Sequence, residues 1–259
     1  MFDPLYLWLF IPLIGFGAFA QGFTGIGFGI IILAGMGFTP WDFERTTVAL
    51  NLLLPILNGA IIFAGRRESR IDWRLVGVIL AGEIFGVPLG YWFILVLGQQ
   101  PIFKIAFGLV LAIFAANELF RPRLKKELPL WTGLAAGFLG GFLAGGFTAA
   151  GPPLALFIYS RLTNPRQAKG TLQVVFASAT LFRLANVIWF GRGIDSPVVE
   201  TAALALAPLV IFMYLGHRLS QRVSNATFLK IVYSFIGAAG LLNLGKGLLQ
   251  MWEKGYAFL

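Results

Sequence analysis

The sequence has few charged residues and no cysteine. Only 12% of its 259 residues are charged, whereas 58% are hydrophobic and the mean hydropathy is +0.82. Soluble domains carry about 25% charged residues, so this composition excludes a soluble fold. The absence of cysteine excludes disulfides, thiolate metal sites and cysteine nucleophiles. A single histidine, and the lack of His-Glu-x-x-His and Gly-x-Ser-x-Gly motifs, argue against an intramembrane enzyme, and we expect no metal and no cofactor.

Several stretches contain no charge at all. Leu5–Trp41 and Leu128–Ser160 are two of them, and each is longer than the ~20 residues that cross a bilayer as a helix. We predict an all-α polytopic protein that forms a single membrane domain, with the lipid bilayer as its surroundings. Basic residues in the short loops are explained by membrane orientation, so we expect no nucleic-acid partner. The eight hydrophobic segments cover residues 5–38, 46–65, 75–98, 101–119, 129–160, 169–191, 197–217 and 227–250.

The second half of the chain repeats features of the first. This predicts two repeats, at about 5–120 and 129–250, joined by a basic linker at 121–128. Many transporters are built from such repeats. Four matched places recur in the same order at offsets of 123 to 126 residues: "GFTGIG" at 22–27 with "GFTAAG" at 146–151, "RIDW" at 70–73 with "GIDS" at 193–196, "PLGYW" at 88–92 with "YLGHR" at 214–218, and "FKIAFG" at 103–108 with "LKIVYS" at 229–234.

The first segment of each repeat is too long for one ordinary crossing. A straight helix over the 34 residues of 5–38 would be about 50 Å long, against a hydrocarbon core of ~30 Å. Each segment is therefore either one tilted, broken helix or a re-entrant hairpin. If both segments cross the membrane, the basic residues divide ten to eight between the two sides. If both are hairpins, the repeats are inverted and the basic residues divide fourteen to four. The positive-inside rule favours the hairpins and places both termini outside the cytoplasm.

A chain that reverses inside a bilayer must satisfy its backbone polar groups with protein or with water in a cavity. Glycine permits the tight reversal, and Thr24 and Thr148 are placed to N-cap the returning half-helices. Two inverted hairpins bring two helix N-termini, each with about half a positive charge, towards one another. This predicts an anion site at the hairpin tips.

Polar residues elsewhere in the segments add to this site. Arg183 lies in mid-segment, where an ionisable residue suggests function. It serves as the charge partner of the substrate, pairs with Glu83, or extends to the membrane surface. Glu83 is also a candidate for a coupling proton. Asn51 and Gln173 fall at similar places in the two halves and either line a cavity or bond between helices. The predicted substrate contacts are Gln21, Thr24, Gly25, Gly27, Asn51, Thr148, Gly151, Pro152, Gln173 and Arg183.

Four stretches of the sequence are familiar: "QGFTGIGFG", the "GRRESRIDW" loop, "GVPLG" and "GFLGGFLAGGFTAAGPP". In these motifs the chain resembles the sulfite-exporter (TauE/SafE) family of membrane permeases, and the resemblance extends from about residue 10 to 250. Where the family commonly has Gly-Thr-Gly-Gly-Pro-Pro, this chain has Ala149 and Ala150 in place of two glycines. The resemblance implies export of sulfite, a sulfonate or a similar small anion across the bacterial inner membrane.

We therefore expect a secondary transporter of a small oxyanion that works by alternating access around the paired tips. The alternative is an anion channel of the same fold. The scarcity of acidic residues within the segments argues against cation uptake. The sequence leaves open the transported species, the direction, the coupling ion and whether the protein forms a homodimer.

Overall fold

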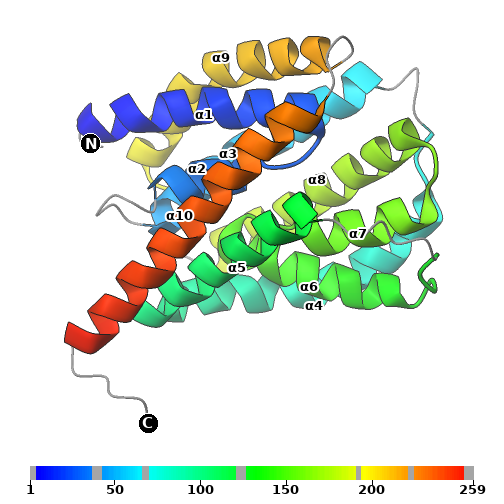
Figure 1. Cartoon of the computed structure of the whole chain (residues 1–259). Coiled ribbons are helices and arrows are strands. Elements are labelled where there is room, and N and C mark those ends of the chain that lie inside the picture. The colour runs from blue at the N-terminus through cyan, green and yellow to red at the C-terminus, as the bar shows by residue number, and fades with distance from the viewer. Residues whose placement is uncertain are drawn as a thin grey trace.

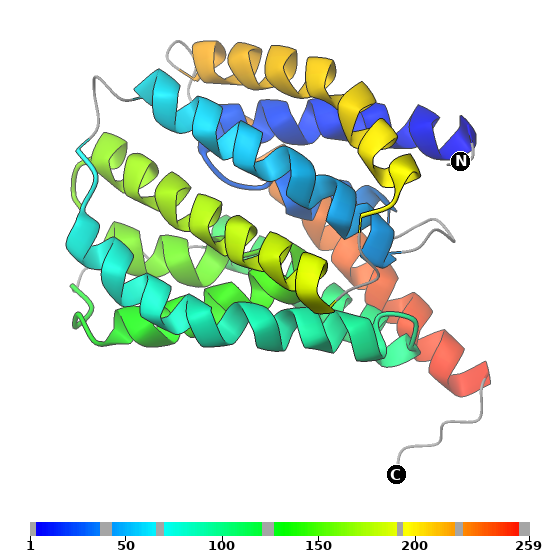
Figure 2. The same cartoon turned by 180° about the vertical axis from the view of Figure 1, so that it is seen from behind.

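The computed structural model describes residues 4–36, 43–65, 70–120, 127–190, 194–220 and 225–253. Within these ranges the chain forms ten helices and no strand, which confirms the predicted all-α class. Figures 1 and 2 show that most of these helices run roughly along one common direction and form a bundle. The helices are α1 (Pro4–Thr24), α2 (Phe28–Met36), α3 (Phe43–Gly65), α4 (Trp73–Leu97), α5 (Pro101–Phe120), α6 (Thr132–Phe147), α7 (Gly151–Arg161), α8 (Pro165–Phe190), α9 (Ser196–Leu219) and α10 (Asn225–Glu253).

Six of the described helices are long and apolar enough to cross a membrane: α1, α3, α4, α8, α9 and α10. The 20-residue α5 and the 16-residue α6 are not among these six. Long apolar helices in this number make the chain a multi-pass membrane protein. Many large apolar side chains are exposed on the outside of the bundle, as expected of a surface that faces lipid.

The first predicted segment, 5–38, divides into α1 and α2, which fold back on each other as hairpin one. Gly17 of α1 lies against the side chain of Ile32, and Gly35 of α2 lies against Leu13. The earlier residue of α1, Leu13, contacts the later residue of α2, Gly35, so the two helices are antiparallel. Gly25 and Gly27 make the reversal with φ values of +90° and +114°, which glycine adopts without strain.

The other long segment, 129–160, likewise divides into α6 and α7, which form hairpin two. Gly140 lies against Leu154, and Gly133, two turns earlier, lies against Phe157. Thr148 ends α6 in the left-handed conformation, with φ 48° and ψ 33°. Pro152 and Pro153 then occupy the first turn of α7, where a missing N–H leaves no helical bond unmade.

The two hairpins enter the bundle from opposite ends and meet at their tips. In Figure 1, α1 begins at the left edge, whereas the chain leads into α6 at the right edge. A β-carbon at Gly29 would collide with the carbonyl oxygen of Thr148, and one at Gly151 would lie 2.8 Å from the side chain of Ile26. These contacts join the two places where the paired hexamers occur.

The packing partners of the two hairpins correspond. Hairpin one packs through α1 on α9, and hairpin two packs through α6 on α4, each pair running parallel. The pairs α3–α9 and α4–α8 correspond in the same way, and α5 packs antiparallel on α10. Exchanging the halves of the chain reproduces this set of pairs, as a two-fold relation between inverted repeats would. The repeat bounds stay a prediction.

Glycine allows the closest of these helix pairs to form. Along α4 and α6, a β-carbon at Gly82, Gly86 or Gly90 would collide with a backbone carbonyl oxygen of α6. On α6, a β-carbon at Gly137 or Gly145 would likewise collide with a backbone carbonyl oxygen of α4. Small residues at such spacing let helix backbones approach directly, which is the main source of helix association in lipid.

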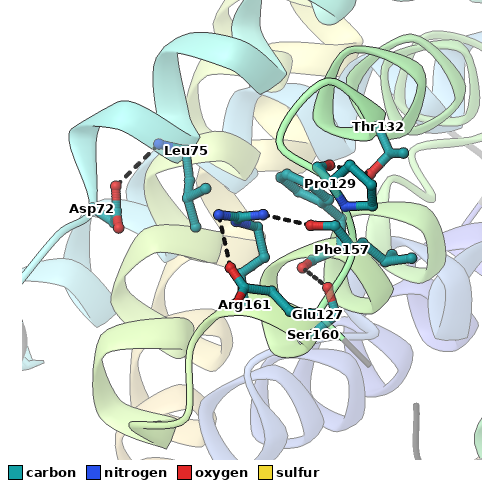
Figure 3. Close-up of polar contacts among 9 residues, drawn as sticks. Asp72, Leu75, Glu127, Pro129, Thr132, Phe157, Ser160 and Arg161 are labelled. Carbon is teal, nitrogen blue, oxygen red and sulfur yellow. Dashed lines mark hydrogen bonds and ion pairs between the residues drawn. The ribbon is translucent and has the colours of Figure 1, made fainter. Parts of the chain in front are cut away.

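The open end of hairpin two is held by Arg161, the last residue of α7 (Figure 3). Its guanidinium donates to the carbonyl oxygen of Leu128 and forms an ion pair of 2.8 Å with Glu127. Asp72, which caps α4 by accepting from the backbone of Arg74 and Leu75, lies at the same end of the bundle. The end of α7 is thereby tied to the segment that leads into α6.

Basic residues gather at this end. It holds the starts of α4, α6 and α8 and the end of α9, with Arg70, Arg74, Arg161, Arg166, Lys169 and Arg218. At the opposite end α1 begins and α10 ends, both at the left of Figure 1. That end has Arg45, which pairs with Asp195 at 2.9 Å, and Lys104, which donates to Gln250. We call the end that holds the starts of α4, α6 and α8 the basic end.

Candidate functional site

A cavity lies where the two hairpin tips meet α3 and α8. Its walls come from both halves of the chain, because each hairpin contributes its tip and each half contributes one long helix, α3 or α8. Six residues that the sequence singled out line this cavity: Gln21, Gly27, Asn51, Thr148, Gly151 and Arg183.

Among the residues that the structure describes, Arg183 is the only charged one in the cavity lining, and it is 1% exposed. Its Nε donates to the Gly145 carbonyl at 2.6 Å, and its two terminal nitrogens donate to the Thr47 carbonyl at 3.1 Å and the Thr47 hydroxyl at 2.7 Å. A guanidinium has five N–H donors, so two remain beyond these three bonds.

Within the described part of the chain, no carboxylate forms an ion pair with Arg183, although the negative charge of Glu44 acts on it from farther away. Glu83, on α4, instead accepts from the Ser178 hydroxyl at 3.0 Å, and its other oxygen has no partner. The proposed pairing of Arg183 with Glu83 is therefore wrong, and so is extension to the surface, because Arg183 is buried. Glu83 is fully buried but does not line the cavity, and its coupling role stays a prediction.

The polar face of α3 supplies side-chain amides to the cavity. Asn51 is 1% exposed, lines the cavity, and has no hydrogen-bond partner on either amide atom. Asn58 accepts at its Oδ1 from the Gln21 side chain at 2.9 Å, and its Nδ2 has no partner. Two buried amides therefore present unused donors at the cavity wall.

The helix N-termini at the two tips differ from the predicted capping. Gln21, not Thr24, caps α2: its Oε1 accepts from the Phe28 backbone N–H at 3.0 Å. The Thr24 hydroxyl instead donates to carbonyls of its own turn, on Ala20 and Ile26. A threonine side chain is too short to leave its turn, whereas glutamine reaches across it.

At hairpin two, the residue that precedes α7 is Ala150, which offers no side-chain cap. Thr148 is the C-cap of α6, and its hydroxyl donates to the Phe147 carbonyl. The predicted N-capping by Thr148 is therefore wrong, although Thr148 does line the cavity. The helix α7 begins at Gly151 without a side-chain cap, and Gly151 lines the cavity.

Four of the expected contacts lie outside the cavity lining: Thr24, Gly25, Pro152 and Gln173. Thr24 is occupied within its turn, and Pro152 has no N–H to offer. Gln173 donates through Nε2 to the Gly25 carbonyl at 2.6 Å, so these two residues contact each other.

Asn58 and Thr180 line the cavity but were not among the expected contacts. Helical spacing could have indicated Asn58, because it lies seven residues after Asn51 on the same face of α3. Thr180 gives no such signal, since its hydroxyl bonds to the Phe176 carbonyl one turn earlier, as threonines in many apolar helices do.

Comparison with known proteins identifies the family of this chain. The model of the family described as "Sulfite exporter TauE/SafE" matches residues 10–242. The chain belongs to this family. Members of the TauE/SafE family are membrane transporters, so the protein is a transporter and not an enzyme.

The chain is similar to two proteins whose names describe transporters. The "Probable sulfite/organosulfonate exporter TauE" of Cupriavidus necator is 27% identical over 234 residues, 88% of this chain and 90% of the relative. The "Probable inner membrane transporter protein TsaS" of Comamonas testosteroni is 25% identical over 196 residues, 75% of this chain and 79% of the relative. No solved structure matches the chain significantly.

Proposed function

We propose that the protein is a secondary transporter that exports sulfite or a small organosulfonate across the bacterial inner membrane. The observation that carries this proposal is Arg183, a buried cation in the cavity wall without a carboxylate partner among the described residues. An unpaired buried charge is unfavourable, and an anion in the cavity would compensate it. The relative from Cupriavidus necator, whose name specifies these anions, supports the choice of substrate.

The rest of the lining suits an oxyanion. The unused donors of Arg183, Asn51 and Asn58 face the cavity, and the N-termini of α2 and α7 add partial positive charge. Apolar residues such as Leu54, Ile26 and Phe176 form other parts of the wall. They would accommodate a short organic tail on a sulfonate.

The proposed mechanism is alternating access between the two ends of the bundle. Two hairpins that enter from opposite ends and meet at one cavity give each end its own moving part, as in transporters with inverted repeats. We assign the basic end to the cytoplasm, because cytoplasmic loops carry the excess of Lys and Arg.

Flux measurements on the purified protein in liposomes test this function. We expect sulfite flux to saturate with concentration and to show counterflow, whereas a channel would conduct without counterflow. Arg183→Gln should weaken sulfite binding by about 100-fold, because it removes the charge that the anion compensates. Arg183→Lys, which retains the charge, is the matched control and should bind more tightly than Arg183→Gln. Unchanged affinity in a folded Arg183→Gln protein would contradict the proposal.

A further inference from the structure

One face of α8 carries both the cavity wall and the contacts that hold hairpin one. Phe176, Thr180 and Arg183 line the cavity from this face. Lys169 and Gln173 lie seven and three residues before Phe176, so they continue the same face towards the basic end. An anion that leaves the cavity along this face must pass Lys169 and Gln173.

Both residues hold backbone carbonyl groups at the tip of hairpin one. Lys169 donates through Nζ to the Gly22 carbonyl at 3.1 Å, and Gln173 donates to the Gly25 carbonyl at 2.6 Å. The methylene chain of Lys169 also covers Gly25: a β-carbon there would lie 3.2 Å from its Cε. These contacts join α8 to the hairpin tip between the cavity and the basic end.

The ammonium of Lys169 has a neutral partner. Carbonyl groups at the C-terminal end of α1 attract a cation through the helix dipole, but this attraction is weaker than that of an anionic oxygen. A departing oxyanion could therefore take the place of the Gly22 carbonyl and release the hairpin tip. Gln173 makes no such exchange, because the one unpartnered atom of this buried side chain, Oε1, is an acceptor.

We propose that Lys169 and Gln173, with Gly22 and Gly25, form a gate that closes the cavity towards the basic end. The gate opens when Lys169 exchanges the Gly22 carbonyl for the anion, so Lys169 is a second anion contact on the transport path. This proposal rests on the proposed function for the identity of the anion, but not for the position of the gate.

Thiol labelling tests the gate, because the chain has no cysteine of its own. Ala179→Cys places a single thiol in the cavity wall, where the parent side chain is 1% exposed. A membrane-impermeant thiol reagent is applied to oriented vesicles from one face at a time. In the Ala179→Cys background, Gln173→Leu and Lys169→Met should each raise labelling from the basic end about five- to tenfold. Labelling from the opposite end should not rise.

Arg74→Met is the matched control. Arg74 is exposed at the same end, so its replacement removes one positive charge without touching hairpin one, and labelling should stay unchanged. Thermal unfolding verifies that each variant is folded, and Gln173→Leu alone decides the test if Lys169→Met does not fold. Labelling that rises equally from both ends, or not at all, would overturn the gate.

A second arm tests the role of Lys169 as an anion contact. Sulfoacetate, which is inert to the thiol reagent, should accelerate basic-end labelling of Ala179→Cys, and Lys169→Met should abolish the acceleration. If acceleration persists in Lys169→Met, Lys169 is not the contact. If sulfoacetate has no effect on any variant but Gln173→Leu still raises labelling, the gate stands and the sulfonate assignment fails.

Discussion

Asn51 shows at the scale of one residue what the cavity is suited to hold. Both amide atoms are buried without a hydrogen-bond partner, and each such group destabilises a folded protein by about 1–3 kcal/mol. The Nδ2 of Asn58 shares this property, and Arg183 has two N–H groups beyond its three hydrogen bonds. A bound oxyanion would accept from all three, so the free protein is less stable than the complex.

Asn51→Leu should therefore affect stability and binding in opposite directions. Leucine has a similar size and needs no hydrogen bond, so we expect a higher melting temperature for the free protein. We expect sulfite affinity to fall by about tenfold or more, because a hydrogen bond to a charged ligand contributes about 1.5–3 kcal/mol. Thermal unfolding with and without sulfite measures both effects.

Asn243→Leu provides the comparison for this variant. Asn243 is equally buried, but its Nδ2 donates to the Ala239 carbonyl on α10, and it does not line the cavity. Its replacement should leave sulfite affinity unchanged. If Asn51→Leu lowers stability and keeps the affinity of the parent, Asn51 has no part in the site.

The sequence does not predict the left-handed backbone conformation of Thr148. A β-branched residue at φ 48° is strained by about 1–2 kcal/mol. The paired hexamer of hairpin one uses Gly25 and Gly27 for its positive φ values. In hairpin two the left-handed position falls on Thr148, directly at the contact with Gly29.

At the scale of helices, the parallel pair α4 and α6 depends on small residues. Gly86→Ala should destabilise the protein by about 1–3 kcal/mol, because the new methyl group would collide with the Phe138 carbonyl oxygen. Gly77→Ala on the same helix should instead stabilise it by about 0.5–1 kcal/mol, since no atom lies within 4 Å of the added carbon. Thermal unfolding in detergent compares the two. Equal effects would mean that α4 and α6 are not packed at Gly86.

The sequence predicted the hairpins but not the roles of their polar residues. The length of the two segments and the division of basic residues predicted that the chain reverses, as it does at 25–27 and 148–150. Segment length is limited by the thickness of the bilayer, and the division of basic residues depends on the orientation of the chain in the membrane. Which of two polar residues, Gln21 or Thr24, caps α2 depends on side-chain reach across the tip. The roles of Lys169 and Gln173 depend on contacts between residues almost 150 positions apart, which no local pattern reports.

At the scale of the whole molecule, the arrangement predicts a topology that labelling can test. Thr163 and Ser196 are exposed at opposite ends of the bundle, one before α8 and one at the start of α9. Single cysteines at these positions should react from opposite faces of the membrane, Thr163→Cys from the cytoplasm and Ser196→Cys from outside. Reaction of both from one face would refute the inverted arrangement.

The position of α8 has a mechanical consequence for the transporter. This one helix holds hairpin one through Lys169 and hairpin two through Arg183, which bonds to the Gly145 carbonyl near the end of α6. If α8 slid or rotated so that its contacts with one hairpin tip weakened, its contacts with the other tip would strengthen. Such linkage would keep the two exits from being open together, so that no continuous leak could dissipate the ion gradients of the cell.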